Sequence, residues 1–168
     1  AAITGFGIGI ALNGGIPIIE IMFGDFITLA MDQIVNSAVK FSQMYANQVK
    51  VPIVIRTPMG GGRGYGPTHS QSLEPLLFNV PNLKMIAPSI VHKPGELLVH
   101  CVNKEQDPVF FVEHKLSYGL ELLNNQNIEE LFYLEYINNN EVFSTTKLNI
   151  VDEESPEITF ITYGGMLP

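Results

Sequence analysis

Cysteine, tryptophan and charge are all scarce in this chain of 168 residues, which contains one cysteine, Cys101, and no tryptophan. A single cysteine excludes a disulfide framework within the chain and favours a reducing compartment. Charged residues make up 15% of the sequence, and 9 lysines and arginines stand against 17 acidic residues, for a net charge of −8. Because no basic cluster is present, we expect no nucleic-acid partner.

Long hydrophobic runs are also missing. No apolar run reaches the roughly 20 residues that a membrane-spanning helix needs, so we expect no membrane segment. The opening AAITGFGIGIALNGG is apolar but has no basic flank, and we interpret it as part of a domain rather than as a signal peptide. The chain does not begin with methionine, and we therefore expect a fragment of a longer protein.

What the chain does contain is an alternation of short apolar runs and helical patterns, with 46% hydrophobic residues. The predicted strands are Ile16–Met22, Val51–Arg56, Lys84–Ala87 and Pro108–Glu113. The predicted helices are Ala1–Asn13, Ile27–Gln48, a short one in HSQSLEPLLFNV, and one that begins at Pro94. Strands that are apolar throughout are typical of a sheet covered on both faces, so the sequence predicts an α/β fold with a mostly parallel sheet.

The pattern breaks after residue 118. Residues 119–157 are rich in Asn and Glu, and we interpret them as a divergent loop, with a hairpin as an option, followed by a linker. The run ITFITY at 158–163 then predicts a new strand. We therefore divide the chain into a main domain (1–118), a loop and linker (119–157) and the start of a truncated second domain (158–168).

The most unusual segment is TPMGGGRGYGPTHSQS, at residues 57–72. Its glycines are not followed by the lysine of a phosphate-binding P-loop, and GFGIGIALNGG near the start lacks the preceding strand of a dinucleotide site. A flexible surface loop is the simpler interpretation. The loop nevertheless follows the carboxyl end of a predicted strand, where open α/β sheets place their ligand sites.

From the residues alone, His69 is either an ordinary surface histidine or a site residue, and its place on this connection favours neither. No His/Cys pair has the spacing of a zinc site. Glu20 is unusual within an apolar strand, and we favour a buried carboxylate that caps backbone groups over a catalytic one. Met22 and Phe26 are more often core residues than cofactor contacts, and Cys101 is expected to be an inert buried thiol.

Five segments then match one family in order and spacing: GFGIGIALNGGIPIIEIMFGDF, MDQIVNSAVKF, VPIVIRTPMGGGRGYGPTHSQSLE, PVFFVEHKLSYG and ITFITYGGML. The chain resembles the β subunit of the thiamin-diphosphate-dependent first component of 2-oxo acid dehydrogenase complexes, which act on pyruvate, branched-chain 2-oxo acids or acetoin. The resemblance covers residues 1–119 closely and returns at 158–167. It implies the pyrimidine-binding module of the thiamin-diphosphate fold.

The resemblance also implies site residues. Met22 and Phe26 match positions that line the pocket for the aminopyrimidine ring, and His69 matches the histidine that faces the reactive carbon of the cofactor. A structural potassium ion, bound in some relatives, would be held near Ile53, Cys101 and Val102. Glu105 and Asp107 would contribute to that ion, although the NKEQDP segment has one residue more than usual.

The partners implied are an α subunit that holds the diphosphate through magnesium, a second β subunit in an α2β2 assembly, and a lipoyl acyltransferase component. The glutamate that activates the cofactor in the family would directly precede Ala1, so we expect residues 1–168 to be inactive alone. The location implied is the bacterial cytoplasm, or an organellar matrix in a eukaryote. Two alternatives are the pyrimidine domain of a transketolase or deoxyxylulose-phosphate synthase, which HSQSLE disfavours, and a non-catalytic assembly module.

Overall fold

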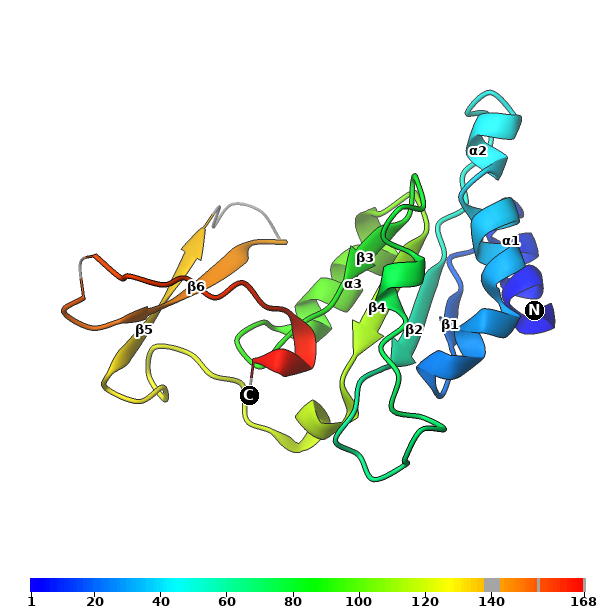
Figure 1. The fold of residues 1–168 in the computed structure, drawn as a ribbon. Coiled ribbons are helices and arrows are strands. Elements are labelled where there is room, and N and C mark those ends of the chain that lie inside the picture. Colours follow the sequence, from blue (N-terminus) through cyan, green and yellow to red (C-terminus); the bar gives the residue numbers. More distant parts are fainter. Residues whose placement is uncertain (138–142, 154, 168) are drawn as a thin grey trace.

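The computed structural model describes residues 1–137, 143–153 and 155–167, and its centre is a four-stranded parallel sheet (Figure 1). The strands are β1 (Ile18–Glu20), β2 (Val54–Pro58), β3 (Lys84–Ile86) and β4 (Val109–Glu113). Their order in the sheet is β1-β2-β4-β3, with all three pairs parallel. The predicted α/β class and parallel sheet are therefore confirmed.

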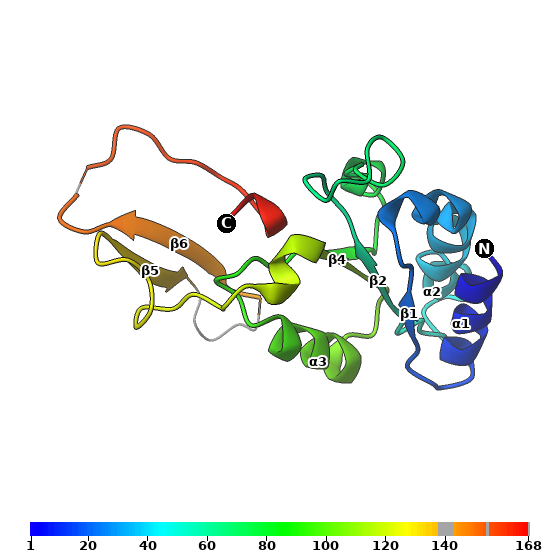
Figure 2. The same ribbon diagram turned by 90° about the horizontal axis from the view of Figure 1, so that it is seen from below.

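Helices cover the two faces of this sheet. Helix α1 (Ala2–Leu12) lies on one face and α3 (Pro94–Lys104) on the other (Figure 2). Successive strand residues alternate between them: Ile55 and Phe110 belong to the core under α1, whereas Val54 and Phe111 pack with residues of α3. Most side chains of the two central strands, β2 and β4, are thus buried, which explains why these strands are largely apolar.

The predicted long helix over 27–48 is broken into three pieces, and in this respect the prediction is wrong. A 3₁₀ helix, η1, spans Gly24–Leu29; a π-helical segment, η2, spans Gln33–Ala38; and a short α2 spans Phe41–Met44. The apolar stripe still faces the core, since Ile27 and Ile34 are fully buried. Burial of a stripe requires only that its side chains share one side, so the stripe does not distinguish among the three helical hydrogen-bond patterns.

A second, two-stranded antiparallel sheet follows the main domain, formed by β5 (Phe132–Ile137) and β6 (Thr145–Ile150). This confirms the hairpin option for the Asn-rich segment. The small sheet extends away from the main one (Figure 1) and is attached through Leu134, which packs in a cluster with Ile90 and Val91. The domain boundaries at 118/119 and 157/158 stay a prediction.

The predicted strand at 158–163 is wrong. These residues pair with no other strand among the described residues, and Phe160 and Ile161 are 87% and 97% exposed. An apolar, β-branched run forms a strand only when another strand accepts its backbone hydrogen bonds. The short helix predicted within 69–80 is reduced to the 3₁₀ turn η3 (Glu74–Leu76). In the part of the chain that the structure describes, no helix has the length and apolar character to cross a membrane.

Candidate functional site

The three predicted cofactor-site residues lie beyond the carboxyl ends of two neighbouring strands. Met22 and Phe26 follow β1, and His69 ends the glycine-rich loop that follows β2. Strands β1 and β2 pair in parallel, with Glu20 opposite Arg56, so the segments that leave them emerge at the same edge of the sheet. This edge is where open parallel sheets bind ligands.

His69 is held within a group of aromatic rings. The ring of Phe23 stacks on the imidazole at a centroid distance of 4.0 Å and an interplanar angle of 12°. Phe26 and Tyr65 approach it edge-on, with centroid distances of 5.5 and 6.2 Å. The His69 side chain is 21% exposed, so one part of the ring remains open to solvent. Packing on three sides gives this histidine a defined orientation, unlike an ordinary surface histidine.

Asp25 binds the imidazole from the first turn of η1. Its Oδ2 lies 3.2 Å from His69 Nδ1, and its Oδ1 accepts a hydrogen bond of 2.5 Å from the Gln71 amide. Burial by itself would raise the pKa of the Asp25 carboxyl, but the hydrogen bonds from His69 and Gln71 outweigh it and lower the pKa below its ordinary value. Asp25 is therefore an anion that ties the segment after β1 to the segment after β2.

Arg63 ties down the glycine-rich loop that carries His69. Its Nη2 donates a 2.5 Å hydrogen bond to the carbonyl of His69, and its Nε donates one of 3.2 Å to the carbonyl of Gly60. The guanidinium carbon also lies 5.5 Å from the centroid of the Tyr65 ring, within the range of a cation–π contact. The loop is thus cross-linked at both ends, which argues against the interpretation as a flexible surface loop.

Gly60 shows why this loop needs glycine. Its φ is +90°, and a Cβ at this position would lie 2.6 Å from Cδ2 of His114. Any other residue would be strained in its backbone and would push against the imidazole ring. The glycine therefore permits the backbone path from β2 toward His69 and leaves room for His114.

Met22 and Phe26 are not core residues. Their side chains are 62% and 41% exposed, which excludes the simpler of the two interpretations offered by the sequence. Phe26 lies edge-on to the ordered His69, and Met22 is exposed in the same segment after β1. Exposed apolar side chains of this kind can stack against a flat heteroaromatic ring. The residues present therefore fit the aminopyrimidine part of thiamin diphosphate.

The predicted potassium residues lie at the opposite, amino-terminal edge of the sheet. Ile53 immediately precedes β2, and its carbonyl accepts a 2.9 Å hydrogen bond from the amide of Val109. The carboxylate of Glu105 pairs with Lys84, and its other oxygen lies 3.5 Å from His100 Nε2. Among the described residues, no three His, Cys, Asp or Glu side chains form a group that could hold a metal ion.

Cys101, on α3 near that edge, is buried with 1% exposure, and burial raises the pKa of its thiol to about 11. A thiol with so high a pKa is almost entirely protonated at neutral pH and is a poor nucleophile. This agrees with the expectation of an inert structural cysteine.

A second polar cluster lies at the carboxyl ends of β2 and β4. Glu113 accepts hydrogen bonds of 2.7 and 3.1 Å from Nε and Nη2 of Arg56, and a further one from the hydroxyl of Tyr118. Glu20 joins at 3.7 Å from Arg56 Nη1, and its side chain is 68% exposed. The sequence-based expectation of a buried Glu20 is therefore wrong, because the residue lies on the edge strand β1 and turns outward to Arg56.

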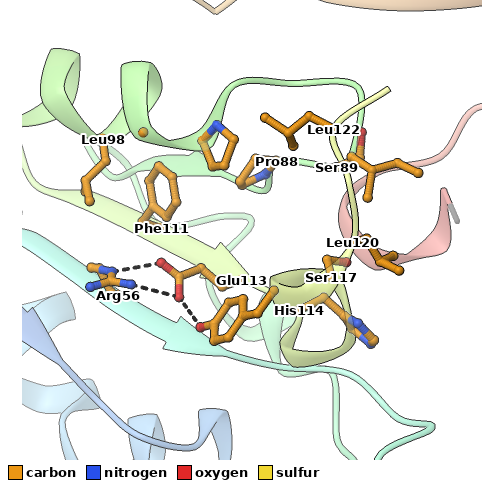
Figure 3. Close-up of a pocket in the computed structure, with 14 residues that line it drawn as sticks. Arg56, Pro88, Ser89, Leu98, Phe111, Glu113, His114, Ser117, Leu120 and Leu122 are labelled. Carbon is orange, nitrogen blue, oxygen red and sulfur yellow. Dashed lines mark hydrogen bonds and ion pairs between the residues drawn. The ribbon is translucent and has the colours of Figure 1, made fainter. Parts of the chain in front are cut away.

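This cluster borders a cavity of about 440 Å³ between the start of α3 and the segment after β4 (Figure 3). Arg56 and Glu113 lie at one end of it, whereas Pro88, Leu98 and Leu122 supply apolar walls. Neither Met22, Phe26 nor His69 lines this cavity. This cavity is therefore separate from the histidine site.

Sequence reasoning missed four residues that surround His69: Phe23, Asp25, Arg63 and Gln71. All four lie within a few residues of a predicted strand end or within the glycine-rich loop. Asp25 stands three residues after the predicted first strand, in FGDF, and Gln71 is part of THSQS. A polar residue close to a strand end was therefore the available signal. Which of them meet cannot be read from the sequence, because the pairing depends on β1 and β2 being neighbours.

Comparison with known proteins places this chain in a family. Residues 1–121 match the model of the transketolase pyrimidine-binding domain. The chain is 42% identical over 121 residues to the acetoin:2,6-dichlorophenolindophenol oxidoreductase subunit beta of Cupriavidus necator, covering 72% of this chain and 36% of that relative. It is 43% identical over 120 residues to the 2-oxoisovalerate dehydrogenase subunit beta of Bacillus subtilis, covering 71% and 36%.

A third relative extends over nearly the whole chain. The mitochondrial pyruvate dehydrogenase E1 component subunit beta-1 of Arabidopsis thaliana is 33% identical over 168 residues, covering 99% of this chain and 43% of the relative. The chain thus spans well under half the length of these three relatives. With the parallel sheet and the family match over residues 1–121 in agreement, the chain belongs to the transketolase pyrimidine-binding domain family.

Proposed function

We propose that this chain supplies the aminopyrimidine side of a thiamin-diphosphate site in a 2-oxo acid dehydrogenase that decarboxylates its substrate and transfers the acyl group to lipoamide. The observation that carries the proposal is the arrangement of Met22, Phe26 and His69. The exposed Phe26 ring lies edge-on to a histidine that is ordered by Phe23 and Asp25, and Met22 is exposed in the same segment after β1. Two of the relatives named above are β subunits of a 2-oxoisovalerate dehydrogenase and of a pyruvate dehydrogenase, which supports the proposal.

Thiamin diphosphate, when bound, supplies a carbon nucleophile and an acceptor for the electrons released with carbon dioxide. The residues of this chain would act around it. Met22 and Phe26 would form an apolar wall for the pyrimidine ring and would exclude water from that side of the site. His69 would exchange a proton or a hydrogen bond with the reacting group at Nε2, since Nδ1 is already bound to Asp25.

An α subunit is the proposed partner, and it would hold the diphosphate through magnesium. Support comes from apolar side chains that this chain leaves exposed. Ile3 and Phe6 on α1 are 70% and 73% exposed, and Leu29 at the end of η1 is 68% exposed. Large apolar side chains that are this exposed are typical of protein–protein contact surfaces. The α2β2 assembly and the lipoyl acyltransferase partner are proposed on the same resemblance.

The decisive test is an activity panel on the complete enzyme, assembled from the full-length β chain and its α subunit. Pyruvate and branched 2-oxo acids are compared by carbon dioxide release, and these acids and acetoin are compared by lipoamide acylation. Each assay is run with and without thiamin diphosphate and magnesium. We expect cofactor-dependent turnover of at least one of them. Absence of turnover with all of them, in an assembly that is shown to be intact, would contradict the proposal.

A binding measurement tests the division of the site between subunits. We propose that residues 1–168 alone hold only the pyrimidine side and are inactive. Calorimetry with thiamin diphosphate and magnesium should then show no measurable binding to the isolated chain. Tight magnesium-dependent binding to the chain alone would overturn this division.

The potassium site near Ile53, Cys101, Val102, Glu105 and Asp107 stays a prediction, and the structure shows a competitor for it. The Lys84 ammonium already neutralises Glu105, so a potassium ion held by that carboxylate would have to displace Lys84. The effect of potassium on Tm is measured by thermal unfolding in sodium chloride and in potassium chloride at the same ionic strength. A potassium-specific rise in Tm that is larger in Lys84→Met than in the unaltered protein would support Glu105 as a ligand. Absence of such a rise in both proteins would contradict it.

A further inference from the structure

We propose that Asp25 is the positioning residue of His69, and that it holds the imidazole with its proton on Nδ1 and with Nε2 free for the reacting group. The inference deepens the proposed function and rests on it for the role of Nε2. The geometry that carries it involves no cofactor: the carboxylate of Asp25 lies 3.2 Å from Nδ1, and Nε2 has no hydrogen-bond partner among the described residues.

The first step of the argument is that the Asp25 carboxylate is anchored at both oxygens. Oδ1 accepts from the Gln71 amide at 2.5 Å, and Oδ2 faces the imidazole. The side chain is only 13% exposed, and its own backbone carbonyl accepts a 2.8 Å hydrogen bond from the hydroxyl of Thr28. A carboxylate fixed at both ends and in its backbone has one orientation to offer to the ring.

The second step is that an ionised carboxylate can only accept hydrogen bonds. Because Asp25 is an anion, the hydrogen between Oδ2 and Nδ1 has to belong to the imidazole. The neutral ring is therefore the Nδ1–H tautomer, and its lone pair lies on Nε2. Protonation would add a hydrogen at Nε2 without disturbing the bond to Asp25, so the same nitrogen can accept a proton and return it.

The third step is that the ring cannot easily turn over to exchange its two nitrogens. Phe23 stacks on it in nearly parallel orientation, and Phe26 and Tyr65 close two further sides. Two cationic side chains, from other segments of the chain, also lie near His69. Arg63 binds the His69 carbonyl, and Lys115 lies 4.7 Å from the centroid of the Phe23 ring. Asp25 is thus the anion that contacts the imidazole, whereas both cations approach its neighbours.

The test reads the tautomer directly. The full chain is produced with ¹⁵N-labelled histidine, and the two ring nitrogens of His69 are assigned by NMR with the help of His69→Gln, at a pH where the ring is neutral. We expect hydrogen on Nδ1 and a bare Nε2 in the unaltered protein. A neutral ring with hydrogen on Nε2 would overturn the proposal, and this outcome needs no variant of Asp25.

Asp25→Asn sharpens the measurement. With Gln71 still donating to the remaining oxygen at this position, the amide introduced by the substitution would point its hydrogens at Nδ1 and would move the ring hydrogen to Nε2. Asp152→Asn is the matched control, because it removes the same charge outside residues 1–121 and Asn tolerates the positive φ of 65° at that position. An unchanged tautomer in Asp25→Asn would contradict the assigned role.

The activity of the complete enzyme provides a second test of the positioning role. In the complete enzyme, Asp25→Asn should lower acyl transfer by about 10²-fold, within the usual range of general acid–base effects, whereas Asp152→Asn should not change it. The two hypotheses fail separately. An inactive unaltered enzyme with the expected tautomer removes the proposed function alone, and an active enzyme whose Asp25→Asn variant keeps both tautomer and rate removes the positioning role alone.

Discussion

Asp25 and Glu113 are two carboxylates at the same edge of one sheet, equally buried but bound by different partners. Their side chains are 13% and 11% exposed. Glu113 is bound by the Arg56 guanidinium and the Tyr118 hydroxyl, whereas Asp25 is bound by an imidazole and an amide. Arginine stays charged at all relevant pH values, while histidine can change its charge near neutrality.

The difference separates structural support from chemistry. Arg56 and Tyr118 both donate to Glu113. The bond to Glu113 raises the pKa of Arg56, and burial together with the same carboxylate raises the pKa of Tyr118. Around Asp25 the partner ring keeps one nitrogen without a partner among the described residues. We infer that the Glu113 cluster joins β2 to β4, and that the Asp25 cluster presents His69.

The largest effect should come from His69→Ala, which tests the inference that the Asp25 cluster presents His69 for chemistry. Loss of a proton-transferring side chain should reduce acyl transfer in the complete enzyme by about 10²- to 10⁴-fold, with little change in Tm. Turnover is measured with the best substrate of the panel. His100→Ala, on α3 across the sheet, is the control and should keep its turnover; equal losses in the two variants would contradict the role of His69.

Arg56→Leu tests the inference that the Glu113 cluster stabilises the fold by joining β2 to β4. It leaves the Glu113 carboxylate with Tyr118 alone in a part-buried place, and we expect a loss of about 2–3 kcal/mol in the free energy of unfolding. Urea denaturation measures it. Glu96→Gln breaks the exposed pair with Lys93, whose side chains are 72% and 69% exposed, and should cost less than about 0.5 kcal/mol. A similar loss in the two variants would show that the Glu113 cluster is no stronger than a surface pair.

Gly60→Ala tests the loop that runs between the two clusters. The left-handed backbone and the approach of His114 together should cost about 2 kcal/mol of stability. Gly64 is the matched control, because its φ is also positive, at +79°, but nothing lies within 4 Å of an added Cβ. Gly64→Ala should therefore cost about 1 kcal/mol. If both variants lose the same stability by chemical denaturation, the contact with His114 contributes nothing.

The smallest effect should be the acid dependence of the Asp25 cluster. The folded-state pKa of Asp25 lies below its unfolded value of 3.8, so its contribution to stability is complete above that value and is lost as the pH falls through the lower folded pKa. Asp25→Asn should remove this part of the slope. Urea unfolding is compared between pH 5 and 2, and parallel curves for the two proteins would refute the shift.

Much of the fold could be predicted because it depends on patterns local in the chain. The apolar runs around Val54 and Phe110 mark strands buried on both sides, and Pro94 marks the first turn of α3. The run at 158–163 has the same composition but remains unpaired, since composition cannot supply a partner strand. The prediction of one continuous helix over 27–48 was wrong for a related reason. A stripe of apolar residues is compatible with several helical hydrogen-bond patterns.

The sequence by itself determined the residue types at the site: an aromatic and a methionine after the first strand, and a histidine at the end of a glycine-rich loop. Only the tertiary structure decided which groups meet. Asp25 and His69 are 44 positions apart and come together because β1 and β2 are neighbours in the sheet, with their carboxyl ends at one edge. Hydrogen bonds have a range of about 3 Å, so they depend on strand order and loop path, which no local pattern encodes.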